Sequence, residues 1–309
     1  MTRADLQQEI TIHSDVAKAR LVASRRRASD GRTVGLRGTI AIWLGASLSG
    51  FSATPAPTPT PTPQAWENAV TTLPRGNFPN PRPIVATYNF GWNGLIAATG
   101  EIKFDRRDDR LQFVADGQTV GFARALWKFD VHHRALADAA TFRPVEMHQI
   151  EITRRKTVTT NLIFKPNGVD RIRTNTKSIR AAKPRTYSFP KGVWDMFSTM
   201  LYLRSQPLCD GDVYRLVVYP ASSPYLATLT VANHSSIKTA AGTYPALKLD
   251  LQLSQIGKKG ELGPHKKFRR ASLWVSDDSD RMLLRIEASI FVGTVFAELQ
   301  SIRFPNDKP

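Results

Sequence analysis

The sequence predicts a mainly β protein, a large curved antiparallel sheet or open half-barrel wrapping one amphipathic helix at 193–204. Two observations support this. Apolar and polar residues alternate perfectly over 247–254, which is typical of a strand with one buried and one wet face. The stretch 192–204 (GVWDMFSTMLYLR) places apolar side chains, Met196 and Phe197 among them, over about half of a helix circumference, with Asp195, Ser198, Thr199 and Tyr202 opposite. A helix with so wide an apolar surface must be buried over more than half of its circumference. The strands before and after it would have to pack against it.

The first 53 residues read as a leader that ends in a signal peptide. The apolar run 39–50 is 12 residues long, which is too short to span a bilayer and right for the core of an export signal. Export through the Sec pathway is the expectation, with a twin-arginine route as the alternative. Translation from a codon near Val34 would produce a standard signal, so 1–33 are either not normally translated or a disordered extension.

A linker is expected between the leader and the folded part. Proline alternates with threonine or alanine over 54–63, which enforces an extended polyproline II conformation and forbids a packed core. Prolines at 74, 79, 81 and 83 extend this character, so the linker is placed at 54–83. One β domain is expected at 84–304, which is a suitable length for a single sizeable core.

The first half of this domain reads as strands in order. Strand-like runs separated by turn residues occur at 84–90, 94–104, 111–117, 147–153, 157–164 and 169–174. The run 120–132 has a mixed period and fits either a strand or a helix.

A basic segment then leads into the helix. Seven Lys or Arg residues and no acid occur between residues 171 and 191, namely Arg171, Arg173, Lys177, Arg180, Lys183, Arg185 and Lys191. The segment is interpreted either as a solvated loop or as a rim that contacts an anionic headgroup or polymer.

The helix is expected to stop before Pro207. Five further strands are predicted in the C-terminal hundred residues, at 213–219, 225–231, 244–254, 270–276 and 282–293. Gly293, at the end of the last run, indicates a bend or bulge that would curl the sheet.

Several short motifs together carry a resemblance. The helix motif is Asp195, Ser198, Tyr202 and Arg204, and the turn motif is Trp274, Asp277, Asp278 and Arg281. With Gly242-Thr243 before a strand and Val292-Gly293 before Glu298-Leu299, they make 83–304 similar to the bacterial exported family called domain of unknown function 3108. The resemblance implies an exported, envelope-located β protein. It implies no activity for any named residue, since the family has none established.

Net charge and cysteine content limit the classes of partner and of metal site that the protein can have. The formal net charge is +17, and +13 remains after the eight basic and four acidic residues of 1–53 are set aside. A basic surface favours anionic partners such as lipid headgroups or envelope polymers. Nucleic acid is not expected, because neither an RNP motif nor a helix-turn-helix accompanies the charge. Cys209 is the single cysteine, which excludes an intramolecular disulfide and a thiolate metal cage.

Candidate catalytic and metal-binding residues lack the spacing that such sites require. His132, His133 and His148 could bind a metal in principle but lack a diagnostic spacing. Asp277, Asp278 and Asp280 could attract calcium, yet acidic residues are also ordinary in a hairpin turn. Neither a G-x-S-x-G elbow nor a nucleophile with a partner histidine is present. We therefore expect no cofactor, no resident metal and no enzymatic activity.

The leading hypothesis is a non-enzymatic protein of a bacterial periplasm or cell envelope. It would bind an apolar or lipid-like anionic ligand, such as an anionic lipid or an envelope glycan, in a groove beside the helix. The alternative is a structural or assembly factor with a filled core, and a hydrolase comes third. We expect no transmembrane span in the mature protein, and the sequence leaves the oligomeric state open. An empty apolar cavity of several hundred Å³ would favour the ligand carrier.

Overall fold

The computed structural model describes residues 64–178, 182–264, 270–290 and 292–305. The expected leader, the proline-rich run at 54–63 and Arg180 lie outside these residues. The helical elements are η1 (Ala65–Ala69), α2 (Gly121–Leu126) and α3 (Met196–Ser205). The strands are β1 (Ile84–Trp92), β2 (Leu95–Arg107), β3 (Arg110–Thr119), β4 (Phe129–Asp138), β5 (Pro144–Thr153), β6 (Thr157–Lys165), β7 (Gly168–Asn175), β8 (Arg185–Ser188), β9 (Val213–Val218), β10 (Tyr225–Thr239), β11 (Gly242–Ile256), β12 (Leu262–Pro264), β13 (Arg270–Ser276), β14 (Leu283–Ile290) and β15 (Gly293–Arg303).

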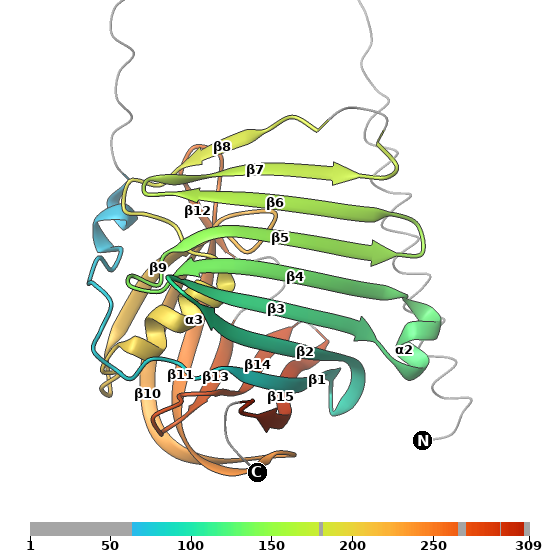
Figure 1. Ribbon diagram of the computed structural model, residues 1–309, viewed down its shortest axis with the longest axis vertical. Coiled ribbons are helices and arrows are strands. Elements are labelled where there is room, and N and C mark those ends of the chain that lie inside the picture. The colour runs from blue at the N-terminus through green and yellow to red at the C-terminus, as the bar shows by residue number, and fades with distance from the viewer. Residues whose placement is uncertain (1–63, 179–181, 265–269, 291, 306–309) are drawn as a thin grey trace, which may run out of the picture. The chain divides into compact units, whose positions relative to one another are not determined.

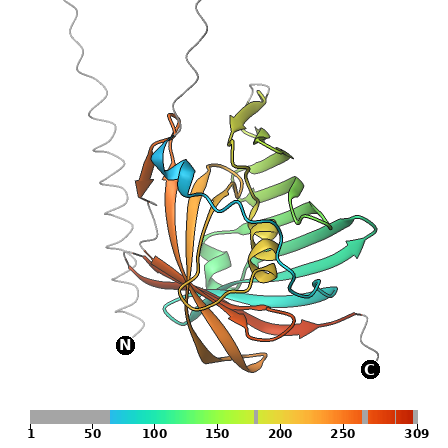
Figure 2. The same cartoon turned by 90° about the vertical axis from the view of Figure 1, so that its left-hand side faces the viewer.

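All strands of the described residues belong to one open antiparallel sheet (Figure 1). Their order is β8-β7-β6-β5-β4-β3-β2-β1-β15-β14-β13-β11-β10-β9, and β12 pairs with β11 off this path. The pairing of β1 with β15 joins the first and last strands of the described residues in the middle of the sheet. The sheet curves around α3, which lies against its inner face (Figure 2). The predicted fold class, a curved antiparallel sheet around one helix, is confirmed.

The core lies between α3 and the inner face, defined here as the face of the sheet toward α3. Leu247 and Leu249 of β11 are buried there, as their alternation predicts, and pack with Tyr202 and Leu203 of α3. On the other side of the helix, Phe197 packs with a second cluster that includes side chains of β4 to β7. One helix thus separates two halves of a single core.

The helix differs from its prediction in where it begins and in which faces are buried. It starts at Met196 instead of residue 193, because Asp195 caps it and Trp194 is bonded to β9. Thr199, expected on the exposed face, is buried, whereas Met196, expected on the apolar arc, is exposed. The helix is therefore enclosed on its polar side as well.

Two runs of the sequence divide into separate elements. The ambiguous run 120–132 contains the short helix α2 followed by the start of β4. The run at 282–293, predicted as one strand, contains β14 and the first residue of β15. That residue is Gly293, which has a φ of 122°. The glycine was expected to mark a bend, and here it starts a new strand that pairs back onto β14.

The segment 64–83, which was expected to be part of a linker, packs against the sheet from its beginning. The Trp66 indole N–H donates to the carbonyl of Gly260 at 2.8 Å. Val70 is buried in the same core cluster as Phe197. Within the described residues, the segment 64–83 therefore belongs to the fold and is not an extended linker.

The edge strand β9 is covered by backbone from two other segments. The Trp194 N–H donates to the Val217 carbonyl at 2.8 Å, and the Tyr219 N–H donates back to the Trp194 carbonyl at 2.7 Å. The Thr71 N–H donates to the Arg215 carbonyl at 2.8 Å. These bonds satisfy β9 groups that no further strand pairs with in the described part of the chain.

Candidate functional site

An apolar cavity of about 380 Å³ lies on the inner face between β1–β4 and the N-terminal end of α3. Its larger lining residues are Phe90, Ile102, Ala115, Trp127, Phe129, Val131, His133, Met196 and Phe197. Phe90, Trp127 and Met196 are also partly open to solvent, so they form its mouth. Glycines contribute to the space, since Gly100 and Gly117 face each other across β2 and β3 and have no side chain to fill it. A cavity of this size and apolar character is suited to a hydrocarbon or ring.

His133 is a titratable group within this apolar lining. Burial lowers the pKa of His133 to about 4, so its imidazole is neutral at physiological pH. Its ring lies edge-on to Phe197, with 5.9 Å between ring centroids. Its Nδ1 is buried without a hydrogen-bond partner in the described residues. A buried polar atom without a partner is costly, and a ligand with a polar atom could satisfy it.

A row of side chains in register leads from this cavity across the inner face. Adjacent strands pair Ala115 with His133, His133 with Gln149, Gln149 with Thr160 and Thr160 with Arg173. Gln149 and Thr160 are buried, and Gln149 donates to Glu151 at 2.8 Å. Because strands lie about 4.8 Å apart, Arg173 is roughly 14 Å from His133.

The row ends in a basic cleft of about 1160 Å³ along β6–β8. Its lining includes Lys156, Val158, Arg171, Arg173, Lys183 and Arg185. Four of the seven basic residues singled out from the sequence are thus brought together, whereas Lys177 and Lys191 do not line the cleft. Arg180 lies outside the described residues.

The cations of the cleft differ in how much they are already paired. Arg171 donates to the Tyr219 hydroxyl at 3.0 Å and to the Ser222 carbonyl at 2.5 Å, which ties β7 to the end of β9. Arg173 contacts Glu151 at 3.4 Å. Lys183 and Arg185 are more exposed, and they are the cations best placed to meet an anion from solvent.

The helix motif serves the structure of α3. The Asp195 carboxylate accepts hydrogen bonds from the Phe197 and Ser198 N–H groups at 2.7 and 2.8 Å and from the Ser198 hydroxyl at 2.9 Å. The Tyr202 hydroxyl donates to the Leu73 carbonyl at 3.1 Å and so holds the incoming segment. Burial lowers the pKa of Arg204 to about 10. Asp195 is therefore an N-cap and not an acid exposed to a substrate.

The turn motif closes the other end of the same helix. Arg281 donates to the carbonyls of Arg204, at 3.0 Å, and of Gln206, and its second nitrogen donates to the Pro207 carbonyl at 2.9 Å. Asp278 accepts from the Arg281 N–H at 3.0 Å and so shapes the turn that presents the arginine. The two motifs, 70 to 80 residues apart in sequence, meet at the C-terminus of α3.

The remaining residues of the turn motif also have partners within the fold. Asp277 lies 2.9 Å from His234 Nδ1, and Asp280 pairs with Arg82 at 2.6 Å. Trp274 packs in a core cluster and lies under Lys248. The three carboxylates considered as calcium ligands thus point to three different partners.

Burial of Asp195 leads to a prediction about pH. Burial raises the pKa of its carboxyl to about 6, while hydrogen bonds from Ser198 and Phe197 oppose the rise. An unfolded aspartate titrates near 4, so the folded protein holds this proton more tightly. The stabilisation is complete below about pH 4 and is lost as the pH rises through about 6. The loss amounts to about 3 kcal/mol, at about 1.4 kcal/mol for each pKa unit.

The check is urea unfolding of the wild type and of Asp195→Asn at several pH values between about 4 and 7. Asparagine keeps an acceptor for the helix N-terminus but does not titrate. We expect the wild type to lose stability relative to the variant as the pH rises across this range. A difference that is constant, or that changes in favour of the wild type, would contradict the shift.

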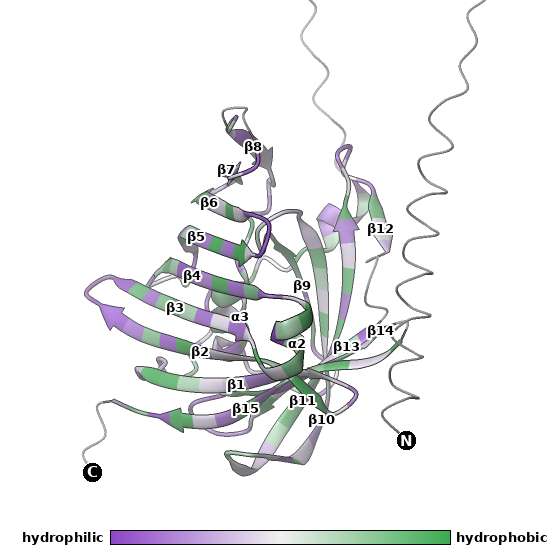
Figure 3. Ribbon diagram, turned by 90° about the vertical axis from the view of Figure 1, so that its right-hand side faces the viewer, coloured by the Kyte–Doolittle hydropathy of each residue, from purple (hydrophilic) through white to green (hydrophobic). Residues whose placement is uncertain are grey.

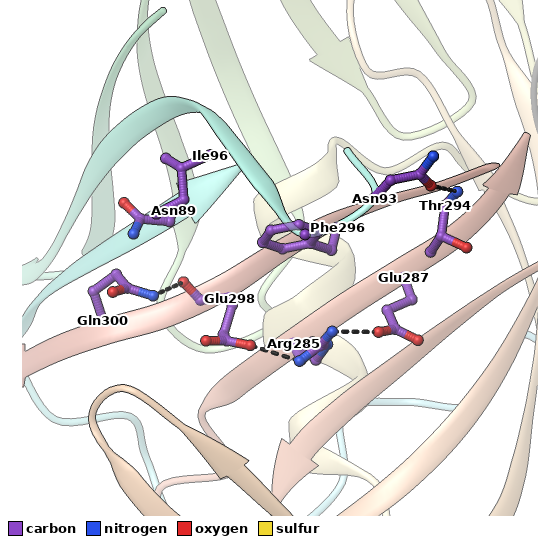
Figure 4. Close-up of a pocket in the computed structure, with 10 residues that line it drawn as sticks. Asn89, Asn93, Ile96, Arg285, Glu287, Thr294, Phe296, Glu298 and Gln300 are labelled. Atoms are coloured by element: carbon purple, nitrogen blue, oxygen red, sulfur yellow. Dashed lines mark hydrogen bonds and ion pairs between the residues drawn. The ribbon is translucent and has the colours of Figure 1, made fainter. Parts of the chain in front are cut away.

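A polar pocket of about 480 Å³ lies on the outer face, at β1, β14 and β15 (Figure 4). In it Arg285 contacts Glu287 at 2.5 Å and Glu298 at 2.6 Å. Two carboxylates on one guanidinium leave this pocket without excess positive charge. It is therefore less suited to an anion than the basic cleft.

The histidines considered as metal ligands do not come together. His132 lies on the outer face, 2.6 Å from Asp116, while His133 points to the inner face. The described residues contain no group of three side chains able to hold a metal ion. They also contain no helix with the length and apolar character that crossing a membrane requires.

Comparisons with known proteins agree with the fold. The family model described as "Protein of unknown function (DUF3108)" matches residues 87–300. A β-barrel-like protein from Brucella abortus, of the domain of unknown function DUF1849, has a TM-score of 0.51 and 10% identity. That match covers 73% of this chain and 99% of the other, and it supports the fold alone. None of the curated protein sequences matches.

Two further solved structures align over similar lengths. One is a candidate lipoprotein from Parabacteroides distasonis, at 9% identity, and the other is a candidate exported protein with a YmcC-like fold from Bacteroides fragilis, at 10% identity. Each match covers 74% of this chain and 99% of the other, with a TM-score of 0.30. A TM-score of that size does not establish a shared fold.

Proposed function

This chain belongs to the family described as protein of unknown function DUF3108, which brings a fold but no activity, and from the geometry we propose that it binds an anionic amphiphile. The apolar part of the ligand occupies the apolar cavity, and its negative group reaches the basic cleft. The protein would act as a non-enzymatic carrier in a bacterial periplasm or cell envelope, for an anionic lipid or a lipid-linked glycan.

The apolar cavity is the single observation that carries this proposal. An assembly factor with a filled core needs no hollow beside its central helix, whereas a carrier needs one of several hundred Å³. The cavity of about 380 Å³ falls in that range, and its mouth is open to solvent. Empty apolar space is costly to maintain without a use, since its lining atoms lose dispersion contacts.

The charge along the row supports the anionic half of the proposal. Along the inner face the side chains change from the apolar lining of the cavity and a neutral His133, through the buried Gln149 and Thr160, which line neither pocket, to the cations of the basic cleft. A molecule with an apolar body and a negative group roughly 14 Å away would match that order. A purely apolar ligand would use the cavity and leave the cleft unused.

Reversing charge in the basic cleft should separate binding of the anionic group from binding of the apolar part of the ligand. In Lys183→Glu with Arg185→Glu, we expect the Kd for a pyrene-labelled dodecanoate to rise about tenfold, because two attractive contacts become repulsive. The Kd for the neutral probe N-phenyl-1-naphthylamine should stay within about twofold. Fluorescence titration measures both, and the effect on the anionic probe should shrink at high salt.

The matched control is Arg106→Glu with Arg107→Glu, which reverses two exposed charges at the β2–β3 turn, far from the cleft in the sheet order. It should leave both probes unaffected. Equal binding of the dodecanoate by wild type and the cleft variant would reject the headgroup role. Failure of the wild type to bind either probe would reject the carrier function and favour the assembly factor.

A further inference from the structure

Large apolar side chains are exposed together at one end of the strands, here called the α2 end. The strand pairings place the β1–β2 hairpin, α2 and the 153–157 turn at this same end. Figure 3 views the molecule from the side that carries α2.

The apolar part of the α2 end consists of large hydrophobic side chains that are exposed to solvent. Leu95 at the hairpin is 65% exposed, Phe122 and Leu126 of α2 are 66% and 60% exposed, and Trp127, which follows α2, is 59% exposed. The β2 strand contacts α2 directly, since the Val120 N–H donates to the Ala97 carbonyl at 2.9 Å. Several large apolar side chains exposed at one end of a sheet are typical of an interaction site.

The basic part of the α2 end lies beside it. The β5–β6 turn carries Arg154, Arg155 and Lys156 in succession with no acid among them. Arg154 donates to the Ala125 carbonyl at 2.5 Å and so fixes this turn to the C-terminus of α2. Lys128 lies two residues after the end of α2 and is exposed. Cations therefore flank the apolar side chains over neighbouring elements.

We propose that the α2 end docks on the surface of an anionic lipid bilayer. Surfaces that combine exposed Trp, Phe and Leu with Lys and Arg partition into the headgroup region of a bilayer. There the apolar side chains insert and the cations contact anionic lipids. The apolar side chains project from a hairpin tip and a short helix, so they reach outward instead of lining a groove for a peptide. A bilayer is the partner that such projecting groups fit.

Docking in this orientation gives the cavity a route to its ligand. Trp127 belongs to the α2 end and also lines the mouth of the apolar cavity. With the α2 end in the headgroup region, that mouth faces the source of amphiphiles, so an acyl chain enters without crossing water. This route rests on the proposed function, whereas docking itself depends on Leu95, Phe122 and Leu126, which do not line the cavity.

The test is sedimentation with sucrose-loaded vesicles of phosphatidylcholine containing about a quarter phosphatidylglycerol. In Leu95→Ser with Phe122→Ser and Leu126→Ser we expect the partition coefficient to fall at least tenfold, since each buried side chain contributes by its apolar area. The control variant, Leu73→Ser with Ile163→Thr and Val213→Thr, removes exposed apolar groups elsewhere and should bind within about twofold of wild type. Circular dichroism confirms that both variants are folded.

The charge of the partner is tested separately. Lys128→Glu with Arg155→Glu should weaken binding at least tenfold, because each basic residue near an anionic surface contributes about fivefold. Vesicles of phosphatidylcholine alone should bind the wild type at least tenfold more weakly than the mixed vesicles. Equal binding to both vesicle types would reject anionic lipid as the partner.

The outcomes distinguish docking from ligand binding. If the wild type binds N-phenyl-1-naphthylamine but no vesicles, docking is rejected and the carrier function stands. If it binds vesicles but no probe, the carrier function is rejected and docking stands. If the apolar variant sediments with mixed vesicles as well as the wild type does, the α2 end is not the docking surface.

Discussion

Phe197→Ala is expected to lower the free energy of unfolding by about 3 to 5 kcal/mol, the usual cost of truncating a buried phenylalanine. Its ring stacks on Phe113 with 5.1 Å between centroids and meets His133 edge-on. Removing it joins new empty space to the apolar cavity that it already lines. Urea unfolding at neutral pH measures the change.

The control for this variant is its neighbour in the first turn of α3. Met196 is 43% exposed, so Met196→Ala should cost less than about 1 kcal/mol. Thr199, which the helical pattern placed opposite Phe197 in solvent, is unsuitable as a control. It is buried, and its hydroxyl donates to the Asp195 carbonyl at 2.6 Å. Similar small losses at Phe197 and Met196 would show that α3 is not the centre of the core.

Arg281→Ala should destabilise the protein by about 4 kcal/mol. The guanidinium satisfies three carbonyls at the end of α3, and each buried carbonyl left without a donor costs about 1 to 3 kcal/mol. Its face also stacks on Phe78, with 3.4 Å between Cζ and the ring centroid. Thermal and urea unfolding should both detect the loss.

Lysine at this position should recover only part of the stability, because one ammonium cannot reproduce a planar fork that reaches three acceptors. The matched control is Arg82→Ala, which breaks the exposed pair with Asp280 and should cost about 1 kcal/mol or less. If Arg281→Ala is no more destabilising than Arg82→Ala, the arginine does not hold the helix end.

Strands were the most predictable part of this fold, because alternation reports directly on a sheet with one buried face. The 247–254 pattern placed β11 correctly, and the strand-like runs at 157–164 and 169–174 correspond to β6 and β7. The long strand β15 and the short strands β8 and β12 were not predicted. β8 and β12 contain four and three residues, too few for a period to be visible, and they exist through pairing with longer neighbours.

The start of α3 was misjudged because side-chain polarity does not reveal a competing backbone partner. Val193 and Trp194 continue the apolar arc of the helix, yet the backbone of Trp194 pairs with β9. Asp195 then has the residue type and spacing of an N-cap, a signal that the sequence did contain. Giving the cap more weight than the apolar arc would have placed the boundary correctly.

The inner position of the basic residues could not be read from the sequence of β7. Ile172 lies between Arg171 and Arg173, and simple patterning would bury the isoleucine and expose the arginines. Ile172 is exposed instead, because pairing with β6 aligns Arg171 with the buried Leu162 and Arg173 with the buried Thr160. Only the neighbouring strands determine that face, so the basic cleft emerges from register.

Among the motif residues that carry the family resemblance, Asp195 and Arg281 hold the two ends of α3, and none of the motif residues lines the apolar cavity or the basic cleft. Sequence reasoning found these residues but could not separate support from binding. It set His133 aside as an isolated histidine and did not single out the cavity that surrounds it. Four strands, the helix α3 and Trp127 build that cavity, and no short motif describes such an arrangement.

The covering of β9 has a consequence for how this protein avoids self-association. An unpaired strand edge is a template on which another chain can add by hydrogen bonding, and closed barrels escape this by having no edge. Here Thr71 and Trp194 occupy the β9 edge, while β8 is four residues long and lies between Pro184 and Pro190. Both edges therefore offer few free donors to a second chain. The sheet can stay open beside its helix, with room for a guest, without becoming a seed for fibrous growth.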